Sequence, residues 1–343
     1  MDVALTLPPQ TELAQVAERA ALAERLGVRV LHVPEMTHDS LMVAALAINA
    51  TSELVVRTSM TLAFPRSPMI TAYAAWDLAR FSGHRFELGL ASQVRGNIEG
   101  RFSVPWSEPV GWLDDYLVAL RKIFTAFALG TGLEHHGPHY TFTRLQPAFT
   151  PAPLLGDPPK VCLGAVGPKM VTLAGRRADR LVTHATNSHP RYLEEVITPA
   201  LTAGAGELGR PVPPVTVVPM CITAADADDL PEARRRTQEQ LAFLLTTPNY
   251  QHTLRILGLA EVGERLTAAA RDQHWTRLVN ELDDDTLHAL LPEATWAELP
   301  EVLRRWYGPW ADQISLPWPD GDPDRFRAEV VEPLQAGSVE GRR

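Results

Sequence analysis

Short apolar runs alternate with longer helical segments along almost the whole chain, and this alternation limits the possible folds more than any other feature. Eight runs have strand character, and each precedes a segment of helical periodicity. Short buried strands that alternate with helices predict a parallel sheet, because each helix returns the chain to the start of the next strand. We expect strands within 2–7, 28–33, 53–64, 85–92, 160–165, 180–186, 214–224 and 312–316.

The helical segments are recognised by apolar spacing and by residues that stop a helix. In 11–26, for example, Leu13, Val16 and Ala20 lie near helical spacing, and Gly27 follows as a C-terminal stop. We expect helices within 11–26, 39–49, 67–81, 110–128, from 168 onward, and within 190–208, 231–245, 252–257, 259–271, 283–291, 296–307 and 324–335.

Eight strand–helix units in 343 residues predict an α/β fold, a closed (β/α)8 TIM barrel. The alternative is an open doubly wound sheet with an added domain. That fold favours a glycine-rich loop after an early strand, whereas the first strand here is followed by LPPQTE, without glycine. We therefore expect one domain over 1–335 and a disordered tail at 336–343. Two segments exceed what one unit needs: 132–159 as an inserted loop, and 225–300 as extra helices in the C-terminal half, packed outside the barrel.

Composition excludes several classes of protein. Hydrophobic residues make up 45% and charged residues 21%, and the 41 acidic against 32 basic residues give a formal charge of −9. Such a chain does not attract nucleic acid by its net charge. Cys162 and Cys221 lie in apolar runs and are expected to be buried free thiols. We see no signal peptide, and no apolar run approaches the roughly 20 residues of a membrane span, so the sequence predicts a cytoplasmic protein without a membrane partner.

In a barrel of this type, function resides in the loops that follow the C-terminal ends of the strands. The loop after the second strand holds Glu35, His38 and Asp39, a cluster that can bind a polar ring edge or move a proton. Asp39 precedes a helix, and capping is its favoured role. For Glu35 and His38, the sequence allows either a catalytic or a structural role. The other segments selected by this rule are 8–10, 59–68, 91–106, 165–170, 186–189 and 317–319.

Two further loops have polar or backbone groups that could face a ligand. The segment SMTLAFPRSP, at 59–68, could face a flat ligand or serve only as strand end and turn. The loop at 165–170 joins a strand to a helix, and Gly167 and Pro168 leave free N–H groups at the helix N-terminus, where an anion such as phosphate is favoured. This signal is weak alone, because many such loops look alike.

Aromatic and basic residues near the mouth suggest pocket walls. Arg95 and Trp106 lie in a glycine-containing loop that either covers a site or is a solvated surface loop, and Trp318 follows the last strand. The loops at 95–106 and 133–158 are expected to shape the substrate pocket. The remaining histidine cluster does not have the spacing of a common metal motif, so no metal site is expected; it comprises His135, His136 and His139.

Several motifs, in their order along the chain, resemble the luciferase-like oxidoreductases. GHRFELGLASQ (83–93) is similar to a family strand, PKVCLGAVGPKMVTLAGRRADRLV (159–182) to a later strand with its anion loop, and TSMTLAFPRSPM (58–69) to the third strand and its exit. VPEMTHDS and RGNIEGRFSVPWSEP resemble a coenzyme F420-dependent subgroup. The resemblance spans roughly 1–335 in order and spacing.

The resemblance implies a (β/α)8 barrel with a non-proline cis peptide between Ser59 and Met60, behind the cofactor ring. It also implies that Glu35 lies near the ring. Many relatives have a histidine directly after this acidic position, whereas here the residue is Met36, with His38 two residues further on. The cofactor-binding residues predicted in this way are Ser59, Met60, Thr61, Ser92, Gln93, Ala165, Val166, Gly167 and Pro168, with the phosphate on the last four.

The function implied is hydride transfer between coenzyme F420 and a small organic substrate, with Glu35 or His38 positioning a group or moving a proton. The alternative on the same fold is a monooxygenase that uses reduced FMN and oxygen, because a fold alone does not fix the cofactor. A third hypothesis is a barrel that binds a flavin or another ligand without catalysis. Members of the family are often dimers, so the resemblance also implies a homodimer.

Overall fold

Parallel pairing of neighbouring strands closes a complete ring in the computed structural model, which describes residues 1–272 and 275–336. β1 pairs with both β2 and β13, and β3 pairs with β5, so no free edge remains in this ring. The predicted barrel is confirmed. Its strands are β1 (Asp2–Thr6), β2 (Val30–Val33), β3 (Val55–Thr58), β5 (Phe86–Ala91), β8 (Lys160–Gly164), β9 (Arg180–Val182), β10 (Val215–Val217) and β13 (Gln313–Leu316), and β4 (Thr61–Leu62) extends the β3 position along β5.

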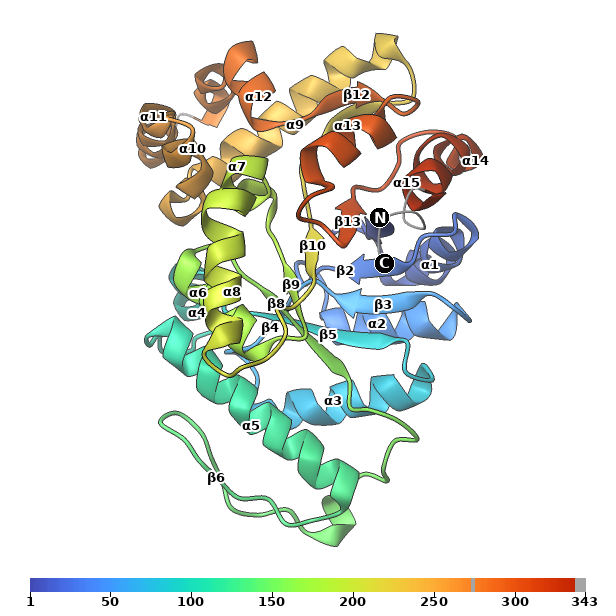
Figure 1. The fold of residues 1–343 in the computed structure, drawn as a ribbon, viewed down its shortest axis with the longest axis vertical. Helices are drawn as coiled ribbons and strands as arrows, with labels where there is room; N and C mark the ends of the chain where they lie inside the picture. The colour runs from blue at the N-terminus through green and yellow to red at the C-terminus, as the bar shows by residue number, and fades with distance from the viewer. Residues whose placement is uncertain (273–274, 337–343) are drawn as a thin grey trace.

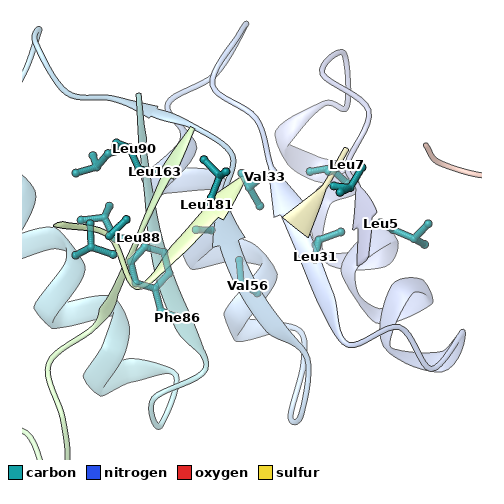
Figure 2. Packing of buried hydrophobic residues seen from close by; sticks show 14 of the residues in the cluster. Leu5, Leu7, Leu31, Val33, Val56, Phe86, Leu88, Leu90, Leu163 and Leu181 are labelled. Carbon is teal, nitrogen blue, oxygen red and sulfur yellow. The ribbon is translucent and has the colours of Figure 1, made fainter. Parts of the chain in front are cut away.

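Helices form the outer layer around this ring, because one face of each strand is apolar and needs cover (Figure 1). The strand side chains beneath these helices are apolar and fully buried, as the close view of the strands illustrates for Leu5, Leu31, Leu88 and Leu163 (Figure 2). Each such side chain contributes roughly 1.5–3 kcal/mol when fully buried. The main covering helices are α1 (Val16–Arg25), α2 (Ser40–Asn49), α3 (Pro68–Phe81), α5 (Pro109–Leu129), α6 (Pro168–Arg177), α8 (Thr198–Gly206), α13 (Leu299–Tyr307) and α15 (Glu332–Ala336).

The strand residues that point into the ring, away from the helices, form a polar network that we did not predict from the sequence. Arg57 on β3 is 1% exposed and donates to Glu87 on β5, His32 on β2 and Gln313 on β13. Burial, followed by the charges of Arg57 and Arg180, holds the pKa of His32 well below its usual range. Burial alone would raise the pKa of Glu87, but the charge and hydrogen bonds of Arg57 outweigh it and lower that pKa.

The segment after β10 departs from the predicted single strand at 214–224. β10 ends at Val217, and β11 (Ile222–Ala224) instead pairs in parallel with β12 (Glu293–Thr295), a strand we did not predict, outside the ring. Pro219 lies between the two strands and has no N–H to donate to a ladder, which accounts for the interruption.

The extra helices predicted in 225–300 are present and gather at one end of the molecule (Figure 1). They enclose a hydrophobic cluster of their own, which includes Leu241, Leu254, Leu266 and Leu287. The helices are α9 (Leu230–Leu245), α10 (His252–Ile256), α11 (Ala260–Arg271) and α12 (Asp284–Leu290).

The inserted loop at 132–159 contains a small hairpin of β6 (His135–His136) and β7 (Thr141–Phe142). Asp115 on α5 holds it: its Oδ1 lies 2.9 Å from Nε2 of the buried His135, and its Oδ2 accepts from the N–H groups of His139 and Tyr140. These histidines therefore contribute to packing. In the described ranges, no three His, Cys, Asp or Glu side chains are gathered so as to hold a metal.

Other predictions about the chain have simpler outcomes. Cys162 and Cys221 are buried and unpaired, as predicted. Considering 1–272 and 275–336, no helix is both long and apolar enough to cross a membrane. Ala336 ends α15, so the predicted disordered tail otherwise lies outside the described residues.

Candidate active site

The predicted site residues gather at the C-terminal ends of the barrel strands, because parallel strands place all these ends at one mouth. Glu35 follows β2, Ser59 follows β3 and Ser92 follows β5. Ala165 follows β8, and Trp318 follows β13. The predicted site residues therefore lie at one end of the barrel, and their side-chain contacts show what each residue can do.

Glu35 is anchored by three donors. Its carboxylate accepts from Ser40 Oγ at 2.9 Å, from the N–H of Leu62 at 3.2 Å and from Arg66 Nη1 at 2.8 Å. The side chain is only 6% exposed. Ser40 Oγ also lies 2.8 Å from the hydroxyl of Thr61. Glu35 thus ties the exit of β2 to the segment that leads into α3.

Arg66 was not singled out in the sequence, although it lies in the selected segment 59–68. Its second guanidinium nitrogen, Nη2, lies 2.7 Å from Asp39. Asp39 also accepts from the N–H groups of Leu41 and Met42, so the predicted capping role is confirmed. Burial alone would raise the pKa of Asp39, but hydrogen bonding and the charge of Arg66 outweigh it and lower that pKa.

His38 and Met36 occupy the rest of this loop. Met36 is 54% exposed, and its carbonyl accepts a hydrogen bond from Arg101. His38 is partly exposed, and its ring has no hydrogen-bond or ion-pair partner in the part of the chain that the structure describes. Of the two predicted catalytic residues, His38 is therefore the one with free ring nitrogens.

The peptide bond between Ser59 and Met60 is cis, as the resemblance implied. The Met60 side chain lies against two glycines of neighbouring strands. A Cβ on Gly89 would lie 2.8 Å from Met60 Sδ, and one on Gly164 would lie 2.8 Å from Met60 Cγ. The Thr61 side chain is fully buried and hydrogen-bonded to Ser40, so a ligand contact from Thr61 would have to come from its backbone.

At the exit of β5, Gln93 has a φ of 61° and accepts from the N–H of Val94 through its own side chain. Ser92 Oγ donates to the carbonyl of Gln93. Both residues are partly exposed at the mouth. The local turn is therefore fixed by side chains that still reach solvent.

The loop after β8 is held from behind by two residues that sequence reasoning missed. Asn187 donates to the carbonyls of Ala165 and Val166, at 3.0 and 3.1 Å. The hydroxyl of Tyr192 also donates to Val166. Asn187 lies in the selected segment 186–189, but nothing in its surrounding sequence distinguishes it from an ordinary turn residue.

The same loop leads into the N-terminus of α6. Gly167 is the N-cap, and Pro168 occupies the first turn. The N–H groups of Gly167 and Lys169 have no partner among the described residues. A Cβ on Gly167 would lie 3.7 Å from Nε2 of His252, so a histidine from the extra helices faces this end. Such an opening suits an anion.

The three predicted pocket residues have different neighbours. Trp106 packs edge-to-face on Phe64, with ring centroids 5.9 Å apart, and Phe64 stacks on Trp112. Trp318 lies under the guanidinium of Arg19 on α1. The loop at 95–106, expected either to cover a site or to be a solvated surface loop, contains a short helix, α4 (Arg95–Gly100). Arg95 is 70% exposed there and pairs with Glu99.

Two hydroxyl groups at the mouth were not among the site residues predicted from the sequence. Thr6 ends β1 and is partly exposed, and its Oγ1 lies 3.0 Å from Ser315 Oγ on β13. Both belong to the polar inner face of the ring. A regular strand offers no sequence signal that a threonine near its end faces inward, because the direction depends on strand register.

The chain is a closed parallel barrel with an open helix N-terminus at its mouth, and comparisons with known proteins identify its family. The chain belongs to the luciferase-like monooxygenase family, whose model matches residues 2–313. An uncharacterised protein of Mycobacterium tuberculosis is 36% identical over 280 residues, covering 81% of this chain and 82% of the relative.

Solved structures share the fold at low identity. The coenzyme F420-dependent tetrahydromethanopterin reductase of Methanopyrus kandleri superposes with a TM-score of 0.80 at 18% identity, covering 96% of this chain and 98% of that one. An EDTA monooxygenase of Chelativorans gives a TM-score of 0.71 at 14% identity, covering 100% of this chain and 95% of that one. At these identities the structures establish the fold, and both reductases and monooxygenases use it.

Proposed function

We propose that this protein transfers a hydride between coenzyme F420 and a small organic substrate at the C-terminal mouth of the barrel. One observation carries the proposal: the Met60 side chain lies against Gly164 at the end of β8, and the open N-terminus of α6 follows the same strand at the mouth. These two features would provide a surface for a flat ring and N–H groups for its phosphate. When bound, the coenzyme would supply a two-electron hydride carrier.

The choice of F420 over FMN rests on two supports. The segments VPEMTHDS and RGNIEGRFSVPWSEP resemble an F420-dependent subgroup, and the Methanopyrus structure is an F420-dependent reductase. The second candidate is a reduced-FMN monooxygenase, favoured by the similarity to the EDTA monooxygenase. A barrel that binds without catalysis is the third.

The residues would divide the work of binding. Val166, Gly167 and Lys169 would offer backbone N–H groups to the phosphate, while Asn187 keeps the loop in shape from behind. Around the ring we assign Ser59, Met60, Ser92 and Gln93, with Thr61 behind them. Trp106 would line the substrate side, with Arg95 and Trp318 further out.

Glu35 and His38 would act differently. Glu35 already accepts from three donors, so its part would be to fix the loop that carries His38. His38 has free ring nitrogens at the mouth and would exchange the proton that accompanies hydride transfer.

The test measures cofactor binding to the purified protein. Oxidised F420 and, separately, FMN are added, and binding is monitored by the fluorescence of the cofactor ring. We expect F420 to bind and FMN to bind more weakly. Tight FMN binding without F420 binding would favour the monooxygenase, and binding of neither would favour the non-catalytic barrel. Asn187→Ala should weaken F420 binding about tenfold, since it removes two hydrogen bonds worth about 1 kcal/mol each. Asn49→Ala, at the exposed C-terminal end of α2, is the control.

We also propose a homodimer located in the cytoplasm. Met42 and Leu46 lie one turn apart on α2 and are 58% and 38% exposed, and Ile70 on neighbouring α3 is 61% exposed. Exposed apolar side chains grouped in this way suit a subunit contact. Light scattering should give twice the chain mass, and Met42→Lys with Ile70→Lys should shift it toward the monomer.

A further inference from the structure

A cavity lies at the N-terminal end of the barrel, opposite the candidate active site. Its volume is about 360 Å³. We call it the base cavity. It is lined by Glu87, Arg121, Asp157, Pro158, Lys160, Cys162, Asp179, Arg180 and Pro214.

The position of the base cavity follows from where its residues lie on their strands. Lys160 and Arg180 are the first residues of β8 and β9, and Glu87 is the second residue of β5. Strand starts lie at the end of the barrel away from the mouth. Asp157 and Pro158, which end the inserted loop that we expected to shape the substrate pocket, line this cavity instead. None of the single residues assigned above to the cofactor or substrate lines it.

Most charges around the cavity are already neutralised by a partner. Arg121 lies 2.6 Å from Asp179, and Arg57, behind the cavity, lies 2.6 Å from Glu87 Oε2. The thiol of Cys162 adds no charge, since burial raises its pKa to about 12.

Among the described residues, Arg180 is the cation of this cavity that forms no ion pair with a carboxylate. Its hydrogen bond goes to the neutral hydroxyl of Thr216 at 3.3 Å. Burial, followed by the charge of Arg57, lowers the pKa of Arg180, and Glu87 and Asp312 offset only part of this effect. Lys160, 71% exposed at the rim, adds a second positive charge at 3.8 Å from Glu87 Oε1. An anion placed beside Arg180 would be attracted by both cations.

The same cavity limits which anion fits. Glu87 Oε1 has no hydrogen bond in the described part of the chain, and Asp157 also lines the wall. These carboxylates repel a dianion such as phosphate, but they can accept hydrogen bonds. The favoured ligand therefore has one negative charge at one end and a hydroxyl or ammonium donor at the other.

We propose that the base cavity binds a small hydroxy- or amino-monocarboxylate. Its carboxylate lies against Arg180 and Lys160, and its donor group faces Glu87 Oε1. A guanidinium presents parallel N–H groups that match a carboxylate, which makes Arg180 the main determinant of binding.

The test is isothermal titration calorimetry of the purified protein with glycolate and with glycine, in chloride buffer of constant ionic strength. Acetate and inorganic phosphate are the comparison ligands. Glycolate or glycine should bind more tightly than acetate, which lacks the donor, and than phosphate. Arg180→Gln should weaken binding at least about tenfold, as expected for a charged hydrogen bond. Lys160→Gln, at an exposed position that tolerates change, should weaken it less.

Arg235→Gln, which removes an exposed arginine on α9, is the matched control and should leave the affinity unchanged. The proposal is overturned if neither glycolate nor glycine binds, if phosphate binds more tightly than both, or if Lys160→Gln and Arg180→Gln both leave the affinity unchanged. Displacement of glycolate by F420 or FMN would place it at the mouth and would equally overturn the proposal.

Discussion

Single side chains at the barrel mouth hold one loop to another through buried or half-buried polar contacts. Arg66 joins Glu35 and Asp39, and Asn187 joins the loops after β8 and β9. Each of these groups would be costly to leave without its partner, because a buried charge or amide loses its contact with water. The shape of the mouth therefore depends on a few polar residues as much as on its apolar walls.

Arg66→Met tests this dependence. The change leaves the nearly buried carboxylate of Glu35 without its cation, so we expect a loss of stability near the lower end of the roughly 3–5 kcal/mol found for broken buried pairs. Urea unfolding followed by circular dichroism measures it. Adding Glu35→Gln should recover part of the loss. A loss below about 1 kcal/mol, similar to that of a surface substitution, would contradict the anchoring role.

The pH dependence of stability tests the burial of His184. Burial lowers the pKa of His184 to about 4 from 6.5, so between these pH values only the unfolded chain takes up this proton. The stability from His184 is therefore complete above pH 6.5 and is lost as the pH falls toward 4, by up to about 1.4 kcal/mol per pH unit. His184→Asn, which can still accept from the N–H of Thr186, should flatten this part of the urea-unfolding profile.

His136→Asn is the control for that experiment, because the ring of His136 is exposed. A profile that keeps the same slope in His184→Asn as in the native protein would mean that His184 is accessible to protons in the folded state.

At the scale of elements, strands β3, β5 and β8 pack closely where two glycines face Met60 and the backbone of Thr58. Gly89 and Gly164 leave the space that the Met60 side chain occupies. The Thr58 hydroxyl also donates to the carbonyl of Gly89 and accepts from its N–H, both at 2.9 Å, so the two strands stay joined beside Met60.

Gly164→Ala should therefore destabilise the protein by about 1–3 kcal/mol, the usual cost of overpacking a filled interior. Met60→Ala in the same chain should remove most of this cost, because the added methyl group meets only the Met60 side chain at close range. Thermal unfolding of the two single variants and the double variant measures the coupling. Additive losses would show that Met60 is not what fills the space beside Gly164.

At the scale of the whole molecule, the chain has two hydrophobic cores of different kinds. The larger lies between the ring and its helices, and the smaller lies among α9 to α12 and β11. A separate core can open on its own, because few apolar contacts link it to the rest of the molecule.

Leu266→Ala should expose this difference. Leu266 is fully buried in the smaller core, so its truncation costs roughly 2–5 kcal/mol. Hydrogen exchange should then accelerate in α9 to α12 while the barrel strands keep their protection. Leu31→Ala, in the larger core, is the matched control and should accelerate exchange throughout. Equal acceleration everywhere in Leu266→Ala would show that the two cores unfold together.

Local patterns explain why the barrel was predictable from the sequence. Apolar periodicity and helix stops depend on residues a few positions apart, and they located the eight strands and most helices. Our strand prediction was wrong where one local pattern is compatible with two different strand pairings. The run at 214–224 is largely apolar, but Pro219 interrupts it and β11 pairs with β12 outside the ring.

The sequence by itself determined the barrel, the loops that form its mouth, the capping by Asp39 and, through resemblance, the position of the cis peptide. Only the tertiary structure decided that Glu35 is bound by Arg66, that Arg57 links His32 to Glu87 inside the ring, and that Arg180 faces a cavity at the base. The physical reason is register: which side chains meet inside a closed ring depends on pairings between residues far apart in the chain, and no local pattern encodes them.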